Sequence, residues 1–289
     1  MYEQIIFNSK IDLMKKFLIV AILMMPFLVL TSCSSDDNNT TTSNASKTYQ
    51  LSSVSNPDIS GTAKFIQNED GSITVELSLA GTTAGNMHPA HIHVNTALEG
   101  GGIAVTLEPV DGATGTSTTT FTELDNTTAV TYAEMVDFDG YINVHLSAAD
   151  LGTLVAQGDI GQNELTGTSI TYALNEVNAS GVSGTAVFAQ RVNEETLITL
   201  SLTGTVLGTD HVTHIHDGSV ATAPGAIAIT LTTVDGESGI SFTNVSQKDD
   251  NSPITYTELL IFPGYINIHA SETDLAVVAQ GDIGSSALN

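Results

Sequence analysis

The stretch Ser72-Ile-Thr-Val-Glu-Leu-Ser-Leu79 alternates apolar and polar residues and is rich in β-branched side chains. In a β-strand, successive side chains point to opposite faces, so this alternation is typical of a strand with one buried face. The stretch Thr196-Leu-Ile-Thr-Leu-Ser-Leu202 largely repeats the pattern. The sequence therefore predicts half-buried β-strands in both halves of the chain.

Turn-forming dipeptides divide these apolar stretches. Aspartate or proline followed by glycine favours the tight turns that join strands. The dipeptides are Asp70-Gly71, Asp111-Gly112, Asp139-Gly140, Asp235-Gly236 and Pro263-Gly264. Many short strands with almost no helical pattern predict an all-β protein built of sandwiches or barrels. A single helical turn is expected at Ser147–Leu151 and another at Ser271–Leu275, where a serine can cap the turn.

The two halves of the chain are similar in sequence. Gly61-Thr-Ala-Lys-Phe65 returns as Gly184-Thr-Ala-Val-Phe188, which is 123 positions later. Each copy has roughly 115 residues, which is enough to bury its own core and far more than a solenoid repeat contains. We therefore expect tandem domains. Their predicted bounds are 48–162 for the first domain, 163–169 for the linker and 170–289 for the second domain.

The N-terminal segment resembles a bacterial lipoprotein signal peptide. Lysines at 10, 15 and 16 precede an apolar run over 17–30, which is shorter than the roughly 20 residues of a membrane-spanning helix. The run ends at Leu30-Thr-Ser-Cys33, which is similar to a lipobox, and Cys33 is the only cysteine. The resemblance implies a signal peptide over 1–32 and a lipid anchor on Cys33.

The residues after this cysteine are polar and lack apolar periodicity, so 33–47 are expected to form a flexible tether. Ser34 follows the cysteine, and the resemblance to sorting signals implies the outer membrane or the cell surface of a Gram-negative bacterium. The lipid at Cys33 would then attach the protein to the membrane.

The charge of the chain excludes nucleic acid as a partner. Seven basic residues face 32 acidic ones, giving a formal net charge of −25. Such a charge repels phosphate backbones and anionic lipid headgroups. Attachment to a membrane must therefore come from the lipid anchor, and a surface ligand would be a protein or a glycan.

All eight histidines fall into two quartets of nearly equal spacing. Imidazole is a frequent ligand of borderline transition metals, so a group of three or four is a plausible copper, zinc or nickel site. The quartets are His88, His91, His93 and His145, and His211, His214, His216 and His269. We expect about one copper or zinc ion in each domain.

Strand geometry predicts which histidines act together. His91 and His93 alternate with Ile92, so both imidazoles should leave the outer face of a strand. His145 alternates with Val144 in the same way, and the second copy repeats the pattern. The predicted metal ligands are His91, His93, His145, His214, His216 and His269. His88 and His211 are expected in loops, where each would close the site or lie at its rim.

These segments resemble two related families. His91-Ile-His93, His214-Ile-His216-Asp-Gly218 and the segments Tyr141-Ile-Asn-Val-His145 and Tyr265-Ile-Asn-Ile-His269 are similar to the CHRD domain, which is named for chordin. They also resemble copper/zinc superoxide dismutase, in which a His-x-His strand and a later Val-His strand supply copper ligands. The resemblance implies two tandem Greek-key β-sandwich domains, with the six predicted ligands at copper-ligand positions.

Several departures argue against dismutase activity. No histidine lies between His93 and His145 or between His216 and His269, so the zinc ligands of a dismutase are missing. Arg191, near a turn at the start of the second copy, is the only arginine, so the first copy has none. No catalytic residue is assigned, and an enzyme is not the favoured interpretation. Three hypotheses remain: a metal-binding envelope protein, an adhesion or interaction module without metal, and a reduced dismutase-like enzyme.

Overall fold

The computed structural model describes residues 44–55 and 59–288. Residues 44–289 form one compact unit. The predicted signal peptide, the lipidation site Cys33 and most of the predicted tether lie outside the described residues. Among the described residues, no helix is long and apolar enough to cross a membrane.

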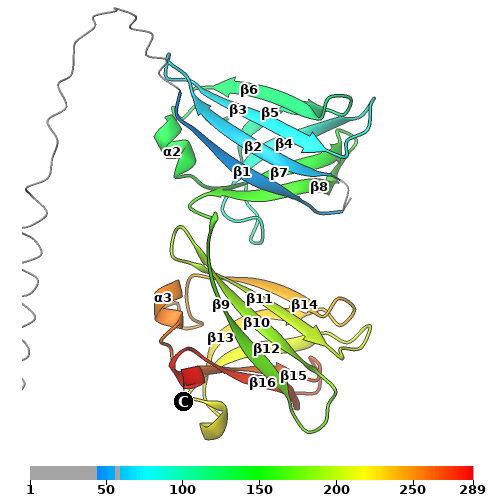
Figure 1. Ribbon diagram of the computed structural model, residues 1–289, viewed down its shortest axis with the longest axis vertical. Helices are drawn as coiled ribbons and strands as arrows, with labels where there is room; N and C mark the ends of the chain where they lie inside the picture. The colour runs from blue at the N-terminus through cyan, green and yellow to red at the C-terminus, as the bar shows by residue number, and fades with distance from the viewer. Residues whose placement is uncertain (1–43, 56–58, 289) are drawn as a thin grey trace, which may run out of the picture. The chain divides into compact units, whose positions relative to one another are not determined.

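The first domain is a closed antiparallel barrel of eight strands (Figure 1). Around the barrel the strands follow the order β1-β2-β3-β6-β5-β4-β7-β8. Because β7 returns to lie beside β4 after β5 and β6, the connection is a Greek key. The strands are β1 (Ser46–Ser53), β2 (Ser60–Gln67), β3 (Ile73–Ala80), β4 (Met87–Val94), β5 (Ile103–Asp111), β6 (Thr116–Phe121), β7 (Asp139–Ser147) and β8 (Asp150–Gly161).

The second domain is an eight-stranded sheet with the same neighbours, except that its two end strands do not pair to close a barrel. Its order is β13-β12-β15-β16-β9-β10-β11-β14, so β12 and β15 correspond to β4 and β7. The predicted all-β fold with two tandem domains is confirmed. The strands are β9 (Leu165–Glu176), β10 (Ser183–Arg191), β11 (Thr196–Thr203), β12 (His211–Asp217), β13 (Ile227–Val234), β14 (Ile240–Val245), β15 (Gly264–His269) and β16 (Val277–Ile283).

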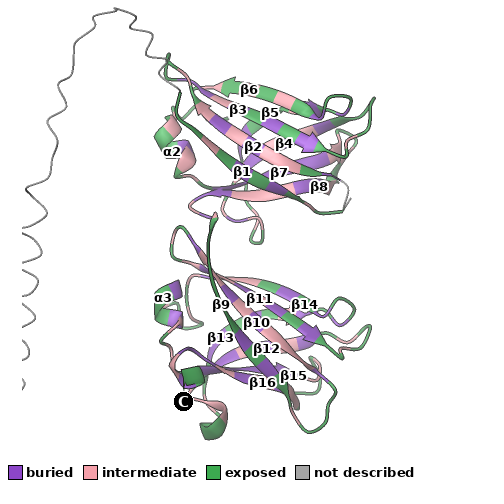
Figure 2. Cartoon of the chain, viewed as in Figure 1, coloured by how far each residue is buried: buried purple, intermediate pink, exposed green. Residues whose placement is uncertain are grey.

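Each domain has its own hydrophobic core, as the alternating patterns predict. Along β3, the side chains of Ile73, Val75 and Leu77 are buried, while those of Glu76 and Ser78 are exposed. Figure 2 shows this alternation of buried and exposed residues along the strands of both domains. The two buried apolar clusters have no residue in common. Each copy therefore buries enough apolar surface to form a separate core.

The helical turns predicted after His145 and His269 are wrong. Ser147 pairs with Asp150 across the hairpin between β7 and β8, so this segment continues the sheet. In the second copy, the Ser271 amide donates to the Asp274 carbonyl in a turn that contains no helix. The requirement to close these hairpins overrides the local capping pattern.

Two short helices form elsewhere. They are α2 (Tyr132–Val136) and α3 (Tyr256–Leu259), and each begins with a capping box. In α2, the Thr131 hydroxyl accepts from the Glu134 amide, and the Glu134 carboxylate accepts from Thr131. The Thr-x-x-Glu pattern is therefore the sequence signal for both helices. Two 3-10 turns, η1 (Val220–Thr222) and η2 (Gly284–Leu288), complete the structure.

The connection between the domains is shorter than predicted. Strand β8 ends at Gly161 and β9 begins at Leu165, so residues 165–169 of the predicted linker belong to a strand.

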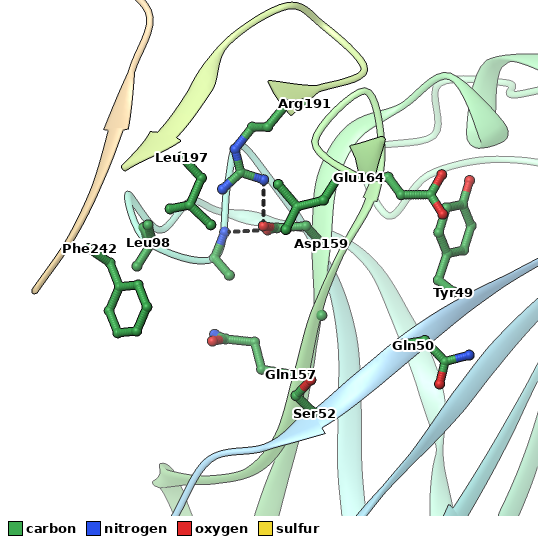
Figure 3. A pocket seen from close by; sticks show the side chains of 13 residues that line it. Tyr49, Gln50, Ser52, Leu98, Gln157, Asp159, Glu164, Arg191, Leu197 and Phe242 are labelled. Atoms are coloured by element: carbon green, nitrogen blue, oxygen red, sulfur yellow. Dashed lines mark hydrogen bonds and ion pairs between the residues drawn. The ribbon is translucent and has the colours of Figure 1, made fainter. Parts of the chain in front are cut away.

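Arg191, at the end of β10, is buried and forms an ion pair with Asp159 at 2.7 Å (Figure 3). Its Nε also donates to the side-chain oxygen of Asn244 at 2.7 Å.

Candidate metal centre

Three histidines of the first domain converge on the outer face of its barrel. His91 and His93 lie on β4 and His145 on the neighbouring strand β7, and one ring nitrogen from each lies within 4.8 Å of the others. The residues between and beside them, Ile92 and Val144, are fully buried in the core. The prediction that these imidazoles leave the apolar side of the sheet is confirmed.

The second domain contains an equivalent triad. His214 and His216 lie on β12 and His269 on β15, again with one nitrogen from each within 4.8 Å of the others. In both copies the two strands pair antiparallel, with His91 opposite Asn143 and His214 opposite Asn267. The third histidine is two residues beyond this asparagine, so it shares the same face of the sheet.

Main-chain carbonyls determine the tautomers of the first triad. His93 Nδ1 lies 3.0 Å from the Gly101 oxygen, and His145 Nδ1 lies 2.7 Å from the Leu151 oxygen. A carbonyl only accepts, so each Nδ1 carries the hydrogen and each Nε2 keeps its lone pair. His91 presents the opposite nitrogen, because its Nδ1 lies 3.1 Å from His145 Nε2.

The second triad uses the same arrangement. His216 Nδ1 donates to the Gly225 carbonyl at 3.0 Å, and His269 Nδ1 donates to the Leu275 carbonyl at 2.8 Å. His214 Nδ1 is buried and has no hydrogen-bond partner. Each domain therefore directs two Nε2 atoms and one Nδ1 atom toward a common point.

The unpartnered nitrogens fit a transition metal. His93 Nε2 and His216 Nε2 are buried without a partner, as is His214 Nδ1. Leaving such groups unsatisfied destabilises a protein, whereas a metal ion would accept their lone pairs. Two nitrogens bound to one zinc or copper ion at about 2.0–2.1 Å are about 3.3–3.6 Å apart. The separation of 3.1 Å between His91 Nδ1 and His145 Nε2 is close to this value.

The pKa values of His91, His145 and His214 are lowered, which favours the neutral form of these three imidazoles. Burial lowers the pKa of His91, and the neighbouring His145 and His93 lower it further. Burial also lowers the pKa of His145, despite the opposing hydrogen bond to Leu151. The pKa of His214 is lowered by burial and then by its two partner histidines. A neutral imidazole is the form that binds a metal, so the lowered pKa values favour metal binding at neutral pH.

His88 and His211 do not join the triads, and the prediction that they lie in loops is wrong. His88 lies within β4 and His211 begins β12, and both are buried on the inward side. His88 Nδ1 donates to the His145 carbonyl at 3.1 Å, and His211 Nδ1 donates to the His269 carbonyl at 2.8 Å. Each of these two histidines therefore lies on the opposite face of the sheet from the triad. Each is hydrogen-bonded there to the backbone of the strand that carries the third histidine.

Sequence reasoning missed the carbonyl groups that orient the histidines. A carbonyl has no side-chain signature, but Gly101 and Gly225 mark two of them. A Cβ on Gly101 would lie 2.0 Å from the Val94 oxygen, and one on Gly225 would lie 1.8 Å from the Asp217 oxygen. Only glycine allows this close approach, so a glycine at the equivalent point of both copies was the available signal.

The arrangement resembles a metal site with an open position. Three imidazoles supply three ligands, and a tetrahedral ion would retain a fourth position for water or an added ligand. Asp125 opposes part of the lowering of the His91 pKa that burial and the neighbouring histidines cause, and Asp249 does the same for His214. Arg191 is 1% exposed and paired with Asp159, so it offers no charge to an incoming anion.

Comparison with known proteins shows a similarity for the first domain. Residues 41–154 match the family model of the CHRD domain, and this range contains His91, His93 and His145. The second domain lies outside the matched range but has the same strand neighbours and an equivalent triad. No curated protein matches the sequence of the chain.

Proposed function

We propose that this protein is a lipid-anchored binding protein of the bacterial cell envelope, and that each domain holds one copper or zinc ion. The observation that carries the proposal is the set of ring nitrogens in each triad. Main-chain carbonyls fix the orientation of two imidazoles in each triad. His93 Nε2 in the first triad, and His214 Nδ1 and His216 Nε2 in the second, are buried without a hydrogen-bond partner. What distinguishes the triads from the other buried histidines is that three ring nitrogens in each domain lie within 4.8 Å of one another.

The donor set supports copper or zinc. Imidazole nitrogen suits both ions, and neither triad includes a thiolate or a carboxylate ligand. Neutral ligands and an open position suit reversible binding and buffering of the ion. A bound ion would supply Lewis acidity or redox capacity, and the protein residues orient the ligands and keep them unprotonated.

The proposed location rests on the N-terminal sequence. The apolar run before Leu30-Thr-Ser-Cys33 and the polar stretch after it support lipidation at Cys33 and a tethered position in the outer membrane or at the cell surface. The charge of −25 supports a location away from nucleic acid. A protein or glycan ligand at the cell surface is part of this proposal.

A second candidate is an interaction module that needs no metal. Val206 and Leu207 are consecutive apolar residues with 64% and 72% of their surface exposed. They lie between β11 and β12, where they would suit contact with a protein partner. This candidate predicts that a chelator leaves partner binding and thermal stability unchanged.

Metal content distinguishes the two candidates. Full-length protein is loaded with copper or zinc, passed over a desalting column and measured by elemental mass spectrometry. The variant His91→Ala/His93→Ala/His214→Ala/His216→Ala removes two ligands from each triad. Thr118→Ala, which changes an exposed position on the outer face of β6, is the control. We expect two ions per chain in the wild type and control and none in the variant; equal retention by all three proteins would refute the proposal.

A further inference from the structure

We propose that Tyr141 and Asp159 in the first domain, and Tyr265 and Asp282 in the second, are positioning residues of the metal sites. They hold the loop whose glycine carbonyl orients one histidine of each triad. This inference rests on the proposed metal-binding function and assigns roles to residues outside the triads.

In each domain, the tyrosine and the aspartate lie in register with one histidine of the triad. On the first sheet, His93 of β4 lies opposite Tyr141 of β7, and Tyr141 lies opposite Asp159 of β8. On the second sheet, the corresponding row is His216, Tyr265 and Asp282. Residues directly opposite on adjacent antiparallel strands share a face, so each row places a histidine, a tyrosine and an aspartate side by side.

The tyrosine contacts its histidine in two ways. The Tyr141 ring stacks on the His93 ring with 4.9 Å between centroids and 16° between planes. Its hydroxyl accepts from the Gly101 amide at 3.1 Å, while the Gly101 carbonyl accepts from His93 Nδ1 at 3.0 Å. The tyrosine therefore holds both the imidazole ring and the residue that determines the ring's tautomer.

The aspartate holds the other end of the same loop. The Asp159 carboxylate accepts from the Ala97 amide at 2.8 Å. The loop between β4 and β5 is thus attached to the sheet at Ala97 and at Gly101. Two attachments on one short loop restrict the movement of the Gly101 carbonyl relative to His93.

The second domain repeats these contacts with a different loop. Gly225 donates to the Tyr265 hydroxyl at 2.8 Å, and Val220 donates to the Asp282 carboxylate at 2.7 Å. The Tyr265 ring stacks on His216 at 5.1 Å and 16°. This loop is one residue longer, because the glycine follows the histidine by nine positions instead of eight. The same two attachments, one to a tyrosine and one to an aspartate, therefore occur in two loops that differ in length and sequence.

The tyrosine should affect metal affinity because it holds the carbonyl that accepts a hydrogen bond from a metal-ligating histidine. Groups that orient a metal-bound histidine typically change metal affinity by about 10–100-fold when removed. Without the hydroxyl, the Gly101 amide loses its partner while the bonds of Ala97 and Gly102 remain. The Gly101 carbonyl is then held less firmly in the position that favours the Nδ1-protonated form of His93. The phenylalanine variant retains the ring and its stacking, so it isolates the effect of the hydroxyl.

The first experiment compares Tyr141→Phe with Tyr132→Phe in the His214→Ala/His216→Ala background, which leaves only the first site. Tyr132 lies in α2 and packs against the same core, so its variant is a matched loss of one hydroxyl. Copper and zinc affinities are measured by competition with a chelator, and copper coordination is measured by electron paramagnetic resonance. We expect a loss of at least about tenfold and an altered copper spectrum for Tyr141→Phe alone. Less than a twofold difference from Tyr132→Phe, with an unchanged spectrum, would overturn the inference.

A second experiment tests the aspartate in the His91→Ala/His93→Ala background. Asp282→Ala removes the acceptor for Val220, whereas Asp282→Asn retains an oxygen at the same place. We expect Asp282→Ala to weaken metal binding and Asp282→Asn to restore most of it; equal affinity in both variants would contradict the role. If the parent proteins bind no metal, the proposed function fails; if they bind metal but the tyrosine and aspartate variants do not differ, only this inference fails.

Discussion

His91 Nδ1 lies 3.1 Å from His145 Nε2, and these are the two atoms that would share a metal ion. His145 Nδ1 donates to the Leu151 carbonyl, so His91 must supply the hydrogen between the two rings when no metal is bound. Metal binding at the first site therefore requires His91 to move its proton to the other nitrogen. In the second site, His214 Nδ1 has no partner and no such bond is lost.

This difference predicts unequal affinities. One hydrogen bond contributes about 0.5–1.5 kcal/mol, so the second site should bind copper or zinc about twofold to tenfold more tightly. The measurement compares the two single-site proteins, His91→Ala/His93→Ala and His214→Ala/His216→Ala, by chelator competition. Tighter binding by the first site would show that the hydrogen bond between the imidazoles does not control affinity.

The lowered pKa values predict how stability depends on pH in the metal-free protein. Burial holds the pKa values of His91, His145 and His214 below the ordinary value of 6.5, so the unfolded chain takes up protons first as pH falls. This contribution to stability is complete above about pH 7 and decreases as pH falls through 6.5 toward the folded-state values. Thermal melts from pH 8 to pH 5 measure the decrease.

The control for the pH measurement is the variant that replaces two histidines of each triad by alanine. It removes His91 and His214, so its melting temperature should fall less between pH 7 and pH 5 than that of the wild type. Parallel curves for the two proteins would show that these histidines do not cause the decrease.

Two adjacent glycines provide a test of the loop that orients His93. A Cβ on Gly101 would lie 2.0 Å from the Val94 oxygen, whereas one on Gly102 would meet no atom within 4 Å. Gly101→Ala should therefore destabilise the protein by about 1–3 kcal/mol, and Gly102→Ala should have little effect. Urea unfolding of the two variants measures the difference. A similar loss for both would mean that the loop adapts to the added carbon.

Two ion pairs should differ strongly in their contribution to stability. Arg191 is buried beside Asp159, and its removal leaves Asp159 and Asn244 without their partner, at a cost of about 3–5 kcal/mol. Lys248 and Asp250 form an exposed pair at 3.7 Å, and Lys248→Ala should cost less than about 1 kcal/mol. Chemical denaturation of Arg191→Ala and Lys248→Ala measures both; equal costs would mean that burial of the guanidinium contributes nothing.

The alternating pattern was sufficient to predict the strands and the face on which His91 and His93 lie. That pattern reports the direction of each side chain directly, because successive residues of a strand point to opposite faces. The prediction that His145 joins them also held, since the alternation of His145 with Val144 placed it on the outer face. The convergence of these three residues then depended only on β4 and β7 being neighbours.

The errors arose where tertiary contacts replaced a local signal. The serine at Ser147 matched a helix cap, but pairing between β7 and β8 kept this segment in the sheet. His88 was expected in a loop because it precedes the strand of His91 by three residues, yet it occupies the inward face of β4 and bonds to the His145 backbone. The carbonyls of Gly101 and Leu151 could not be identified as orienting groups without knowing how the loops fold back on the sheet.

The separate cores of the two domains make the duplication a form of redundancy. The apolar cluster that contains Ile92 and the cluster that contains Ile215 share no side chain. A substitution that damages one core therefore leaves the packing beneath the other triad intact. One half can accumulate changes in its loop while the other preserves the original site, so a duplicated chain tolerates mutations that a single domain would not survive.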